Sequence, residues 1–207
     1  VLYYRGNIDI LNEHKSIAVV GSRKISAVGA KLAYNAGSII GKNGFNLVNG
    51  LALGCDAEAL KGALAAGGKC AVVLPCGINE IYPKSNQWIA EEVLKQGGCL
   101  ISEYPEGTRP EKYRFVQRDR LQSGMSQGVL VVEAMEKSGT MHTAEYAKKQ
   151  NRRLACYYHG LLKYSTGNNV LENLYQAAVI KTNEDLENYL CEIADIEEYT
   201  QLSFDFV

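Results

Sequence analysis

Short, unbroken apolar segments recur along the chain and alternate with segments of helical character, and this alternation constrains the fold most. The apolar segments, each bounded by glycine or a polar turn, are residues 16–21, 45–50, 69–75, 98–103, 128–133, 153–158 and, more weakly, 177–181. The helical segments are residues 27–42, 55–66, 85–97, 114–125, 140–150 and 168–176. Continuous apolar runs are typical of strands covered on both faces. The pattern therefore predicts an α/β fold with a doubly wound, mostly parallel sheet.

The composition of the 207-residue chain, with 46% hydrophobic and 22% charged residues, is that of an ordinary globular domain. No apolar run reaches the roughly 18–20 residues that a membrane span requires, so we expect no membrane partner and a cytoplasmic location. The six cysteines form no CxxC pair and the three histidines are isolated. The sequence therefore indicates neither a disulfide framework nor a metal site.

Charge is distributed unevenly along the chain, whose net charge is −1. Residues 181–207 contain eight acidic residues and one lysine, so they carry −7 and the rest of the chain carries +6. We predict one domain over residues 1–180, in which residues 1–15 extend onto the core, followed by an acidic helix or tail over residues 181–207. A mildly basic body is compatible with a polyanionic partner but does not require one.

Loops that follow the predicted strands contain residues suited to binding phosphate. In a parallel sheet these loops meet at one edge, and they include Gly21-Ser22-Arg23-Lys24, the turn at Gly50, and Ser138-Gly139-Thr140 with Lys137 beside it. Glycine lets backbone N–H groups approach an anion, and a helix N-terminus adds about half a positive charge. An ordinary turn after a strand uses the same glycines. The dinucleotide pattern GxGxxG and the P-loop pattern GxxxxGK[ST] are absent, which excludes those two classes of site.

A second basic feature is the segment RPEKYRFVQRDRLQSG at residues 109–124. Five basic residues lie within twelve positions of it, and Tyr113 and Phe115 are interleaved with them. Sites for single-stranded nucleic acid use basic groups to neutralise the backbone and aromatic faces to stack on bases. A solvated helix face held by salt bridges explains the segment equally well.

Acidic residues and a histidine near the strand ends do not combine into a catalytic constellation. Asp56 and Glu58 follow one strand-end turn and Glu133 ends another strand, but neither a carboxylate pair nor a Ser-His-Asp arrangement is indicated. His142 is explained more simply as a helix-face residue than as a base. These residues therefore give little indication of a catalytic site.

Taken together, the strand-end segments resemble the DNA-processing protein A family (DprA, also called Smf). The resemblance extends from about Tyr3 to Ile180 and rests on eight segments in the order and spacing of the family. They are VLYYRGNIDIL, AVVGSRKIS, LVNGLALGCDAEAL, VVLPCGINEIYPKSN, LISEYPEGTRP, FVQRDRLQSGMS, VLVVEAMEKSGTMHTAEYA and GNNVLENLYQA. Any one segment would be weak evidence, but the ordered set is highly specific.

The resemblance implies a Rossmann-like fold that protects single-stranded DNA without transforming it and uses no cofactor. It also implies that the protein helps to load a RecA-type recombinase onto DNA during natural transformation or recombination, and that it forms a homodimer. The family's DNA groove uses the arginine of the GSR loop, the basic residues of the F-x-x-R-N-R segment and the lysine of the K-S-G turn. With the strand-end loops, the predicted DNA- or phosphate-binding residues are Gly21, Ser22, Arg23, Lys24, Gly50, Arg118, Arg120, Lys137, Ser138, Gly139, Thr140 and Asn169.

The chain departs from the family pattern at several positions. Asp119 stands where the family has asparagine between two arginines, which places a negative charge within the predicted phosphate site. Leu60 replaces a histidine, His159 replaces a proline, and Glu172 replaces an apolar residue. These departures indicate a divergent member, for which weaker DNA binding and a role outside transformation are open.

Two other functions remain open. Related Rossmann-like families that release a base from a nucleoside monophosphate carry a glycine-rich turn followed by glutamate, which Ser138-Gly139-Thr140 and Glu145 match poorly. A closed pocket around Glu133 and Glu145 would favour such a nucleotide-binding protein or enzyme, whereas a basic stripe along residues 109–120 would favour DNA. The other possibility is a scaffold whose DNA site has decayed, and Asp119 is the best sign of that.

The last residues of the chain carry a further motif. Residues 201–206, QLSFDF, resemble the short Q-L-x-hydrophobic-x-F peptides that bacterial replication proteins insert into the sliding clamp. An amphipathic end that packs on its own domain is the alternative.

Overall fold

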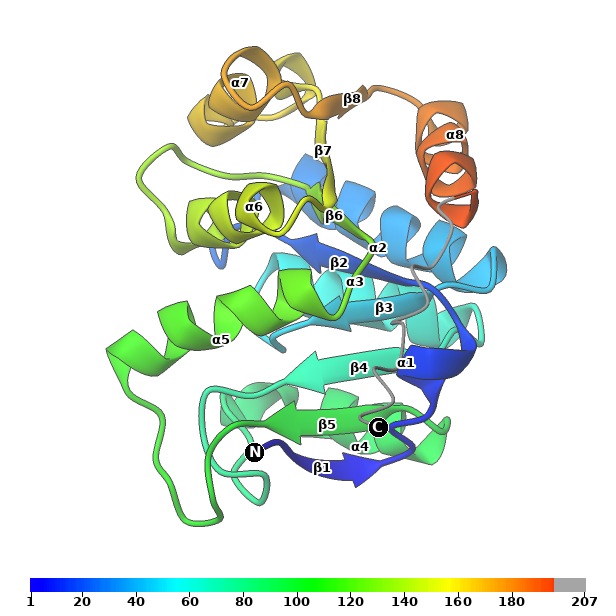
Figure 1. The fold of residues 1–207 in the computed structure, drawn as a ribbon. Coiled ribbons are helices and arrows are strands. Elements are labelled where there is room, and N and C mark those ends of the chain that lie inside the picture. The colour runs from blue at the N-terminus through cyan, green and yellow to red at the C-terminus, as the bar shows by residue number, and fades with distance from the viewer. Residues whose placement is uncertain (196–207) are drawn as a thin grey trace, which may run out of the picture.

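The computed structural model describes residues 1–195, which form an eight-stranded sheet with helices on both faces (Figure 1). The strands are β1 (Tyr3–Gly6), β2 (Ser16–Val20), β3 (Asn46–Asn49), β4 (Cys70–Val73), β5 (Cys99–Ser102), β6 (Gly128–Val131), β7 (Arg153–Tyr157) and β8 (Ala178–Ile180). The α-helices are α1 (Ile10–Glu13), α2 (Ala27–Lys42), α3 (Cys55–Ala65), α4 (Gln87–Lys95), α5 (Lys112–Gly124), α6 (Gly139–Lys149), α7 (Thr166–Asn173) and α8 (Asn183–Ala194). Two short 3-10 helices are η1 (Lys84–Asn86) and η2 (His159–Leu161).

The strand order is β1-β5-β4-β3-β2-β6-β7-β8, and every neighbouring pair is parallel except β1 with β5. The predicted doubly wound, mostly parallel α/β fold is therefore confirmed. The chain builds outward from β2 to β5 in one direction and then returns to place β6 on the other side of β2. The connections after β2 and β6 therefore leave in opposite directions, so the point between these two strands is the switch point of the sheet. A crevice opens at a switch point, beyond the carboxyl ends of the strands.

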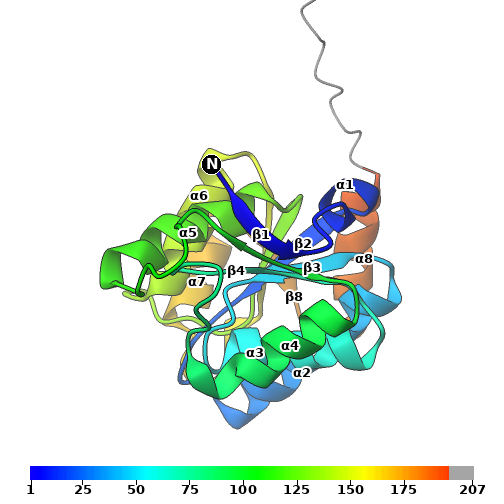
Figure 2. The same cartoon turned by 90° about the horizontal axis from the view of Figure 1, so that it is seen from below.

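The central strands are apolar on both faces because helices cover both. All five residues of β2 are buried: Ile17 and Val19 belong to one core cluster, and Ala18 and Val20 to the other. Figure 2 shows α5 and α6 on one side of the sheet and α2, α3 and α4 on the other. This explains why the sequence shows continuous apolar runs where a one-sided sheet would show alternation.

Two predicted helices differ most from the structure, whereas the bounds of the others agree to within two residues. The helix expected at residues 168–176 begins earlier, at Thr166, and ends at Asn173, because Gln176 adopts a positive φ of 55° that no α-helix accommodates. The segment expected as one helix at residues 85–97 divides into η1 and α4. None of the described helices is long and apolar enough to cross a membrane.

The acidic segment that begins at residue 181 first forms α8, which packs against the core. Thr182 and Asp185 form a capping box at its start. The hydroxyl of Tyr189 donates to the carbonyl oxygens of Val129 (3.3 Å) and Arg153 (3.0 Å). A domain boundary at residue 180 stays a prediction, and residues 201–206 lie outside the described part of the chain.

Helices α2 and α3 cross so closely that glycine is required at the contact. A Cβ on Gly37 would overlap the carbonyl oxygen of Ala59, and a Cβ on Gly62 would overlap that of Tyr34. Each helix therefore presents a glycine to the backbone of the other. The approach brings the N-terminal ends of both helices to the same edge of the sheet, beside the crevice.

We expect Gly37→Ala to lower the free energy of unfolding by about 3 kcal/mol, since the added methyl group forces α2 and α3 apart. Urea denaturation measures the change. Gly124→Ala is the matched control, because a Cβ there meets nothing closer than 3.5 Å; it should change stability by less than about 1 kcal/mol. Equal effects of the two substitutions would contradict this account of the crossing.

Candidate functional site

A groove of about 870 Å³ lies beyond the carboxyl ends of β2 and β6, at the switch point of the sheet. It is bordered by the loop after β2, the loop after β3, helix α5 and the start of α6. The lining residues are Val20, Gly21, Ser22, Arg23, Lys24, Ala52, Asp56, Tyr82, Lys112, Phe115, Val116, Arg118, Asp119, Gln122, Met135, Ser138, Gly139, Thr140, Thr143 and Tyr164. Eight of the twelve predicted site residues line the groove. Seven of them belong to the two predicted glycine loops, and the eighth is Arg118.

Glu133, at the end of β6, fixes the loop after β2. Its carboxylate is fully buried and accepts hydrogen bonds from the backbone N–H groups of Ser26 (2.7 Å) and Tyr164 (3.1 Å). Its own carbonyl oxygen accepts the N–H of Ser22 (2.7 Å). Two separate segments, the loop between β2 and α2 and the segment at Tyr164, are thus tied to Glu133, which holds the Gly21–Lys24 loop against the groove.

The loop at Gly50 is organised by Asp56, at the start of α3. One carboxylate oxygen of Asp56 accepts the backbone N–H groups of Gly50 (3.0 Å) and Ala52 (3.2 Å). A Cβ on Gly50 would overlap the guanidinium of Arg118. Gly50 therefore makes space for that arginine, and its own N–H group is occupied by Asp56.

Arg118 forms the floor of the groove. Its side chain is only 5% exposed, and its Nη1 donates to the carbonyl oxygen of Val73 at the end of β4 (3.2 Å). Its Nε lies 3.4 Å from a carboxylate oxygen of Asp119. A buried guanidinium is tolerated only where anions and acceptors compensate it, and here Asp119 and Asp56 surround it.

Burial raises the pKa of Asp119 to about 6, against the opposing effect of Arg118. The nearby Asp56 raises it further, and the side chain of Gln122 donates a hydrogen bond to it (2.8 Å). Burial likewise raises the pKa of Asp56, while Arg118 and two backbone N–H groups lower it. Asp119 therefore carries half of its negative charge at about pH 6, more of it above that pH and less below it.

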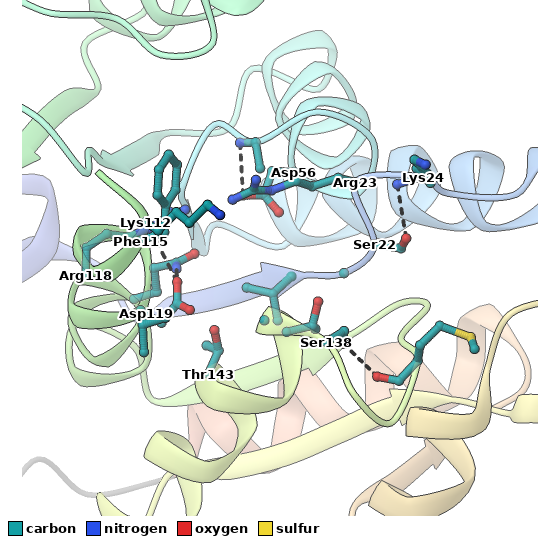
Figure 3. A pocket seen from close by; sticks show the side chains of 18 of the residues that line it. Ser22, Arg23, Lys24, Asp56, Lys112, Phe115, Arg118, Asp119, Ser138 and Thr143 are labelled. Carbon is teal, nitrogen blue, oxygen red and sulfur yellow. Dashed lines mark hydrogen bonds and ion pairs between the residues drawn. The ribbon is translucent and has the colours of Figure 1, made fainter. Parts of the chain in front are cut away.

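Aromatic side chains form one wall of the groove. The guanidinium of Arg23 lies 4.8 Å from the ring centroid of Phe115, which contacts Tyr82 edge to face at 5.5 Å. Figure 3 shows Arg23 extending from the loop after β2 towards α5, where Lys112 and Phe115 lie. Tyr82 is 42% exposed, so part of this wall is open to a ligand.

The opposite wall is the start of α6. Ser138 precedes this helix and its hydroxyl donates back to the carbonyl oxygen of Met135 (2.6 Å), so it makes no side-chain cap. The first N–H groups of α6, at Gly139 and Thr140, border the groove. A helix N-terminus of this kind favours an anion.

Four predicted residues lie away from the lining. Gly50 is buried beneath Arg118, and Arg120 forms an ion pair with Glu103. Lys137 is exposed in the loop before α6, next to the lining residue Ser138. The last is Asn169, which is exposed on α7 and accepts a hydrogen bond from the side chain of Asn173. Their predicted role in DNA binding stays a prediction.

The neighbouring Asn168 has a structural role that the sequence did not reveal. It is buried; its amide donates to the carbonyl oxygens of Val132 and Tyr157 (both 2.9 Å) and accepts the N–H of Ala134 (2.8 Å). It thus joins the ends of β6 and β7. A buried asparagine between two strand ends can be recognised only when those ends are known to be adjacent.

Sequence reasoning did not place several residues in the site, among them Tyr82, Thr143 and Tyr164. Lys112 and Phe115 lie in the basic, aromatic segment that was identified, and that interleaving was the available signal. No sequence signal pointed to Tyr82, because the loop that carries it reaches the groove only through the packing of β4 beside β3.

A closed pocket around Glu133 and Glu145 is not formed by the described residues. Both carboxylate oxygens of Glu133 are used by backbone N–H groups. Glu145 is 46% exposed on α6, with His142 at 4.0 Å. The geometry that would have favoured a nucleotide is therefore not present at these two residues.

Two of the departures from the family pattern contact each other. The ring nitrogen Nδ1 of His159 lies 3.0 Å from a carboxylate oxygen of Glu172. Glu172 on α7 thus has a polar partner in the turn after β7.

A model of the family described as DNA recombination-mediator protein A matches residues 1–190. The chain belongs to this family. Protein Smf of Synechocystis sp. is 38% identical over 155 residues, which are 73% of this chain and 39% of that protein. DNA processing protein DprA of Bacillus subtilis is 35% identical over 154 residues (74% and 52%), and that of Streptococcus pneumoniae 38% over 152 residues (73% and 53%). The chain thus spans between 39% and 53% of the length of these relatives.

Solved structures agree with this assignment. DNA processing protein A from Helicobacter pylori, described with its single-stranded DNA binding mode, superposes with a TM-score of 0.83 at 30% identity, covering 92% of this chain and 86% of that one. The protein from Streptococcus pneumoniae gives 0.79 at 31% identity, covering 96% and 67%. A molybdenum cofactor carrier protein from Chlamydomonas reinhardtii gives 0.61 at 19% identity, covering 87% and 98%, which shows a shared fold alone. The family resemblance and the Rossmann-like fold predicted from the sequence are confirmed.

The raised pKa of Asp119 predicts a pH-dependent stability. Because the native state holds this proton up to about pH 6 and the unfolded chain releases it near 3.8, the free energy of unfolding should fall between about pH 4 and 6 and then level off. Asp119→Asn removes this fall and should raise stability at pH 8 by about 1–3 kcal/mol relative to the native chain. Urea denaturation at pH 5 and pH 8 measures it. A stability difference between variant and native chain that is equal at both pH values would contradict the assignment.

Proposed function

We propose that the protein binds single-stranded DNA in the groove between α5 and α6, protects the strand and assists its transfer to a RecA-type recombinase. It acts by binding, without chemical conversion of the DNA. The proposal rests on membership of a family of DNA recombination mediators and on the similar structure from Helicobacter pylori, which is described with its single-stranded DNA binding mode.

The observation that carries the proposal is the co-location of two kinds of group in one groove. Arg23, Lys24 and Lys112 supply positive charge at its rim, beside the N-terminus of α6. Tyr82 and Phe115 supply ring surface on the same wall. Cations bind the phosphates of the backbone, and aromatic rings stack on the bases. Bases are free for such stacking in a single strand, where they are unpaired.

The groove residues have distinct proposed roles. Arg23 and Lys24 contact phosphates directly, together with the N–H groups of Gly139 and Thr140. Arg118 supports the floor, because its guanidinium is buried and committed to Val73 and the surrounding acids. It therefore contributes a positive field more than a contact.

The finer parts of the function are predictions that follow from the family. They are the RecA-type recombinase as partner, a homodimer, and a role in natural transformation or another recombination process. Binding of a sliding clamp by residues 201–206 also stays a prediction, since those residues lie outside the described part of the chain. A pull-down with the clamp, before and after deletion of residues 201–207, tests it.

We expect Arg23→Ala combined with Lys24→Ala to weaken binding of a labelled single-stranded oligonucleotide by about tenfold or more. The slope of log K against log salt should flatten by about 1.4, because two phosphate contacts of about 0.7 each are lost. Fluorescence anisotropy across a salt series measures both quantities.

The matched control is Lys42→Ala combined with Lys95→Ala. It removes the same charge from exposed lysines at the C-terminal ends of α2 and α4, in the helical layer behind the sheet. It should leave the affinity within about twofold of that of the native chain. Binding that the groove variant leaves intact at every salt concentration would overturn the proposed site.

Asp119 should also make DNA binding depend on pH. Above about pH 6 its charge opposes phosphate, so Asp119→Asn should bind about tenfold more tightly at pH 8. This corresponds to about 1.5 kcal/mol for a charge on the order of 10 Å from a phosphate at an effective dielectric constant of about 20. At pH 5 the variant and the native chain should converge. The ratio of their affinities isolates Asp119 from other groups such as His142; a constant ratio from pH 5 to 8 would refute the idea.

A further inference from the structure

A second cavity, of about 470 Å³, lies at the opposite end of α6 from the groove. It is bordered by the C-terminal end of α6, the amino ends of β7 and β8, and helix α8. The residues that give it its chemical character are Lys148, Arg152, Arg153, Tyr175, Tyr189 and Glu192. Figure 1 shows α6 lying along one face of the sheet, so one end of this helix borders the groove and the other borders the cavity.

The cations of this cavity form no ion pair with any residue in the described range 1–195. The ammonium of Lys148 lies 5.0 Å from the ring centroid of Tyr175, and Arg153 is exposed at the start of β7. Arg152 donates from Nη2 to the carbonyl oxygen of Gly124 (2.9 Å), while its Nε is buried without a hydrogen-bond partner. Glu192 is the one carboxylate among the residues that line the cavity.

Structural roles account for only part of this positive charge. Lys148 and Lys149 lie in the last turn of α6, where cations offset the helix dipole, and Arg152 caps the end of α5. Arg153 has no such role, since it stands on a strand and no helix carbonyl accepts from it among the described residues. The cavity thus keeps an excess of cations over its single carboxylate.

We propose that this cavity, the distal cavity, is a second subsite for single-stranded DNA, in which Lys148 and Arg153 contact phosphates of a strand that leaves the groove along α6. The inference rests on the proposed function of the groove. Helix α6 has 11 residues and is therefore roughly 16 Å long, so a few nucleotides separate the two subsites. Tyr175 adds ring surface beside the cations, as sites for single strands require.

The path between the two subsites has mixed charge. Exposed residues of α6 along it include His142, Glu145 and Lys149. The strand is therefore held at its two contact regions and not along the helix. A short oligonucleotide that fills the groove should be indifferent to the distal cavity, whereas a longer one should engage both.

The test compares oligothymidylates of about 5 and about 20 nucleotides, which lie near the lower end and beyond the upper end of the roughly 4–16 nucleotides of known single-strand sites. We expect Lys148→Ala combined with Arg153→Ala to weaken binding of the long oligonucleotide by about tenfold. Its salt slope should flatten by about 1.4 for two lost phosphate contacts. Binding of the short oligonucleotide should stay within about twofold of that of the native chain.

Two further variants separate the inference from general effects. Lys42→Ala with Lys95→Ala removes the same charge elsewhere and should not reproduce the length-dependent loss. Glu192→Gln removes the opposing carboxylate and should strengthen binding of the long oligonucleotide by about threefold or more, a gain that misfolding cannot produce.

The possible outcomes are distinguishable. Equal losses for both lengths, or a loss that Lys42→Ala with Lys95→Ala reproduces, would overturn the distal cavity as a subsite. So would unchanged binding of the long oligonucleotide by both distal variants; in that case the groove stands if Arg23→Ala with Lys24→Ala still weakens both lengths. If the native chain binds neither length at low salt, the proposed function fails, and the distal cavity fails with it as a DNA subsite.

Discussion

The buried guanidinium of Arg118 is the constraint on which the edge of the sheet depends. An uncompensated cation at that depth would cost several kcal/mol. Two segments that are distant in sequence therefore compensate it, the end of β4 through Val73 and the start of α3 through Asp56, and the adjacent Asp119 on α5 adds a third group. Gly50 is needed because any side chain there would occupy the position of the guanidinium. One buried charge thus determines how the loops after β3 and β4 meet α5.

This arrangement divides the basic residues of the groove into two kinds. Arg118 is fixed and largely neutralised, so it contributes shape and field. Arg23, Lys24 and Lys112 are exposed at the rim, where they can exchange water and counterions for phosphate. Such a division suits a protein that must bind a strand of any sequence and later release it, because contacts to the backbone carry little sequence information. In the proposed function the charge of Asp119 weakens phosphate binding, and its burial beside Arg118 lowers the stability of the fold above about pH 6.

Three of the residues that depart from the family pattern, Asp119, His159 and Glu172, have polar partners in the structure. His159 and Glu172 each look anomalous alone, but they lie 3.0 Å apart and satisfy each other. Asp119 retains the hydrogen bond from Gln122 that an asparagine oxygen could equally accept. A sequence read position by position shows replacements, whereas the structure shows that these side chains have hydrogen-bonding partners.

Local sequence determined the elements and the two glycine loops of the groove. Continuous apolar runs predicted strands buried on both faces, and the glycine loops Gly21–Lys24 and Ser138–Thr140 were correctly placed at one edge, because parallel strands put their carboxyl ends together. Only tertiary structure decided which side chains face that edge. Arg120 lies two positions after Arg118 on one helix, so it points elsewhere and pairs with Glu103. Asn168, and not Asn169, joins the strand ends, since a helix turns by about 100° per residue. Tyr82 and the distal cavity depend on strand order and on the packing of α8, which arise from contacts between segments that no local pattern encodes.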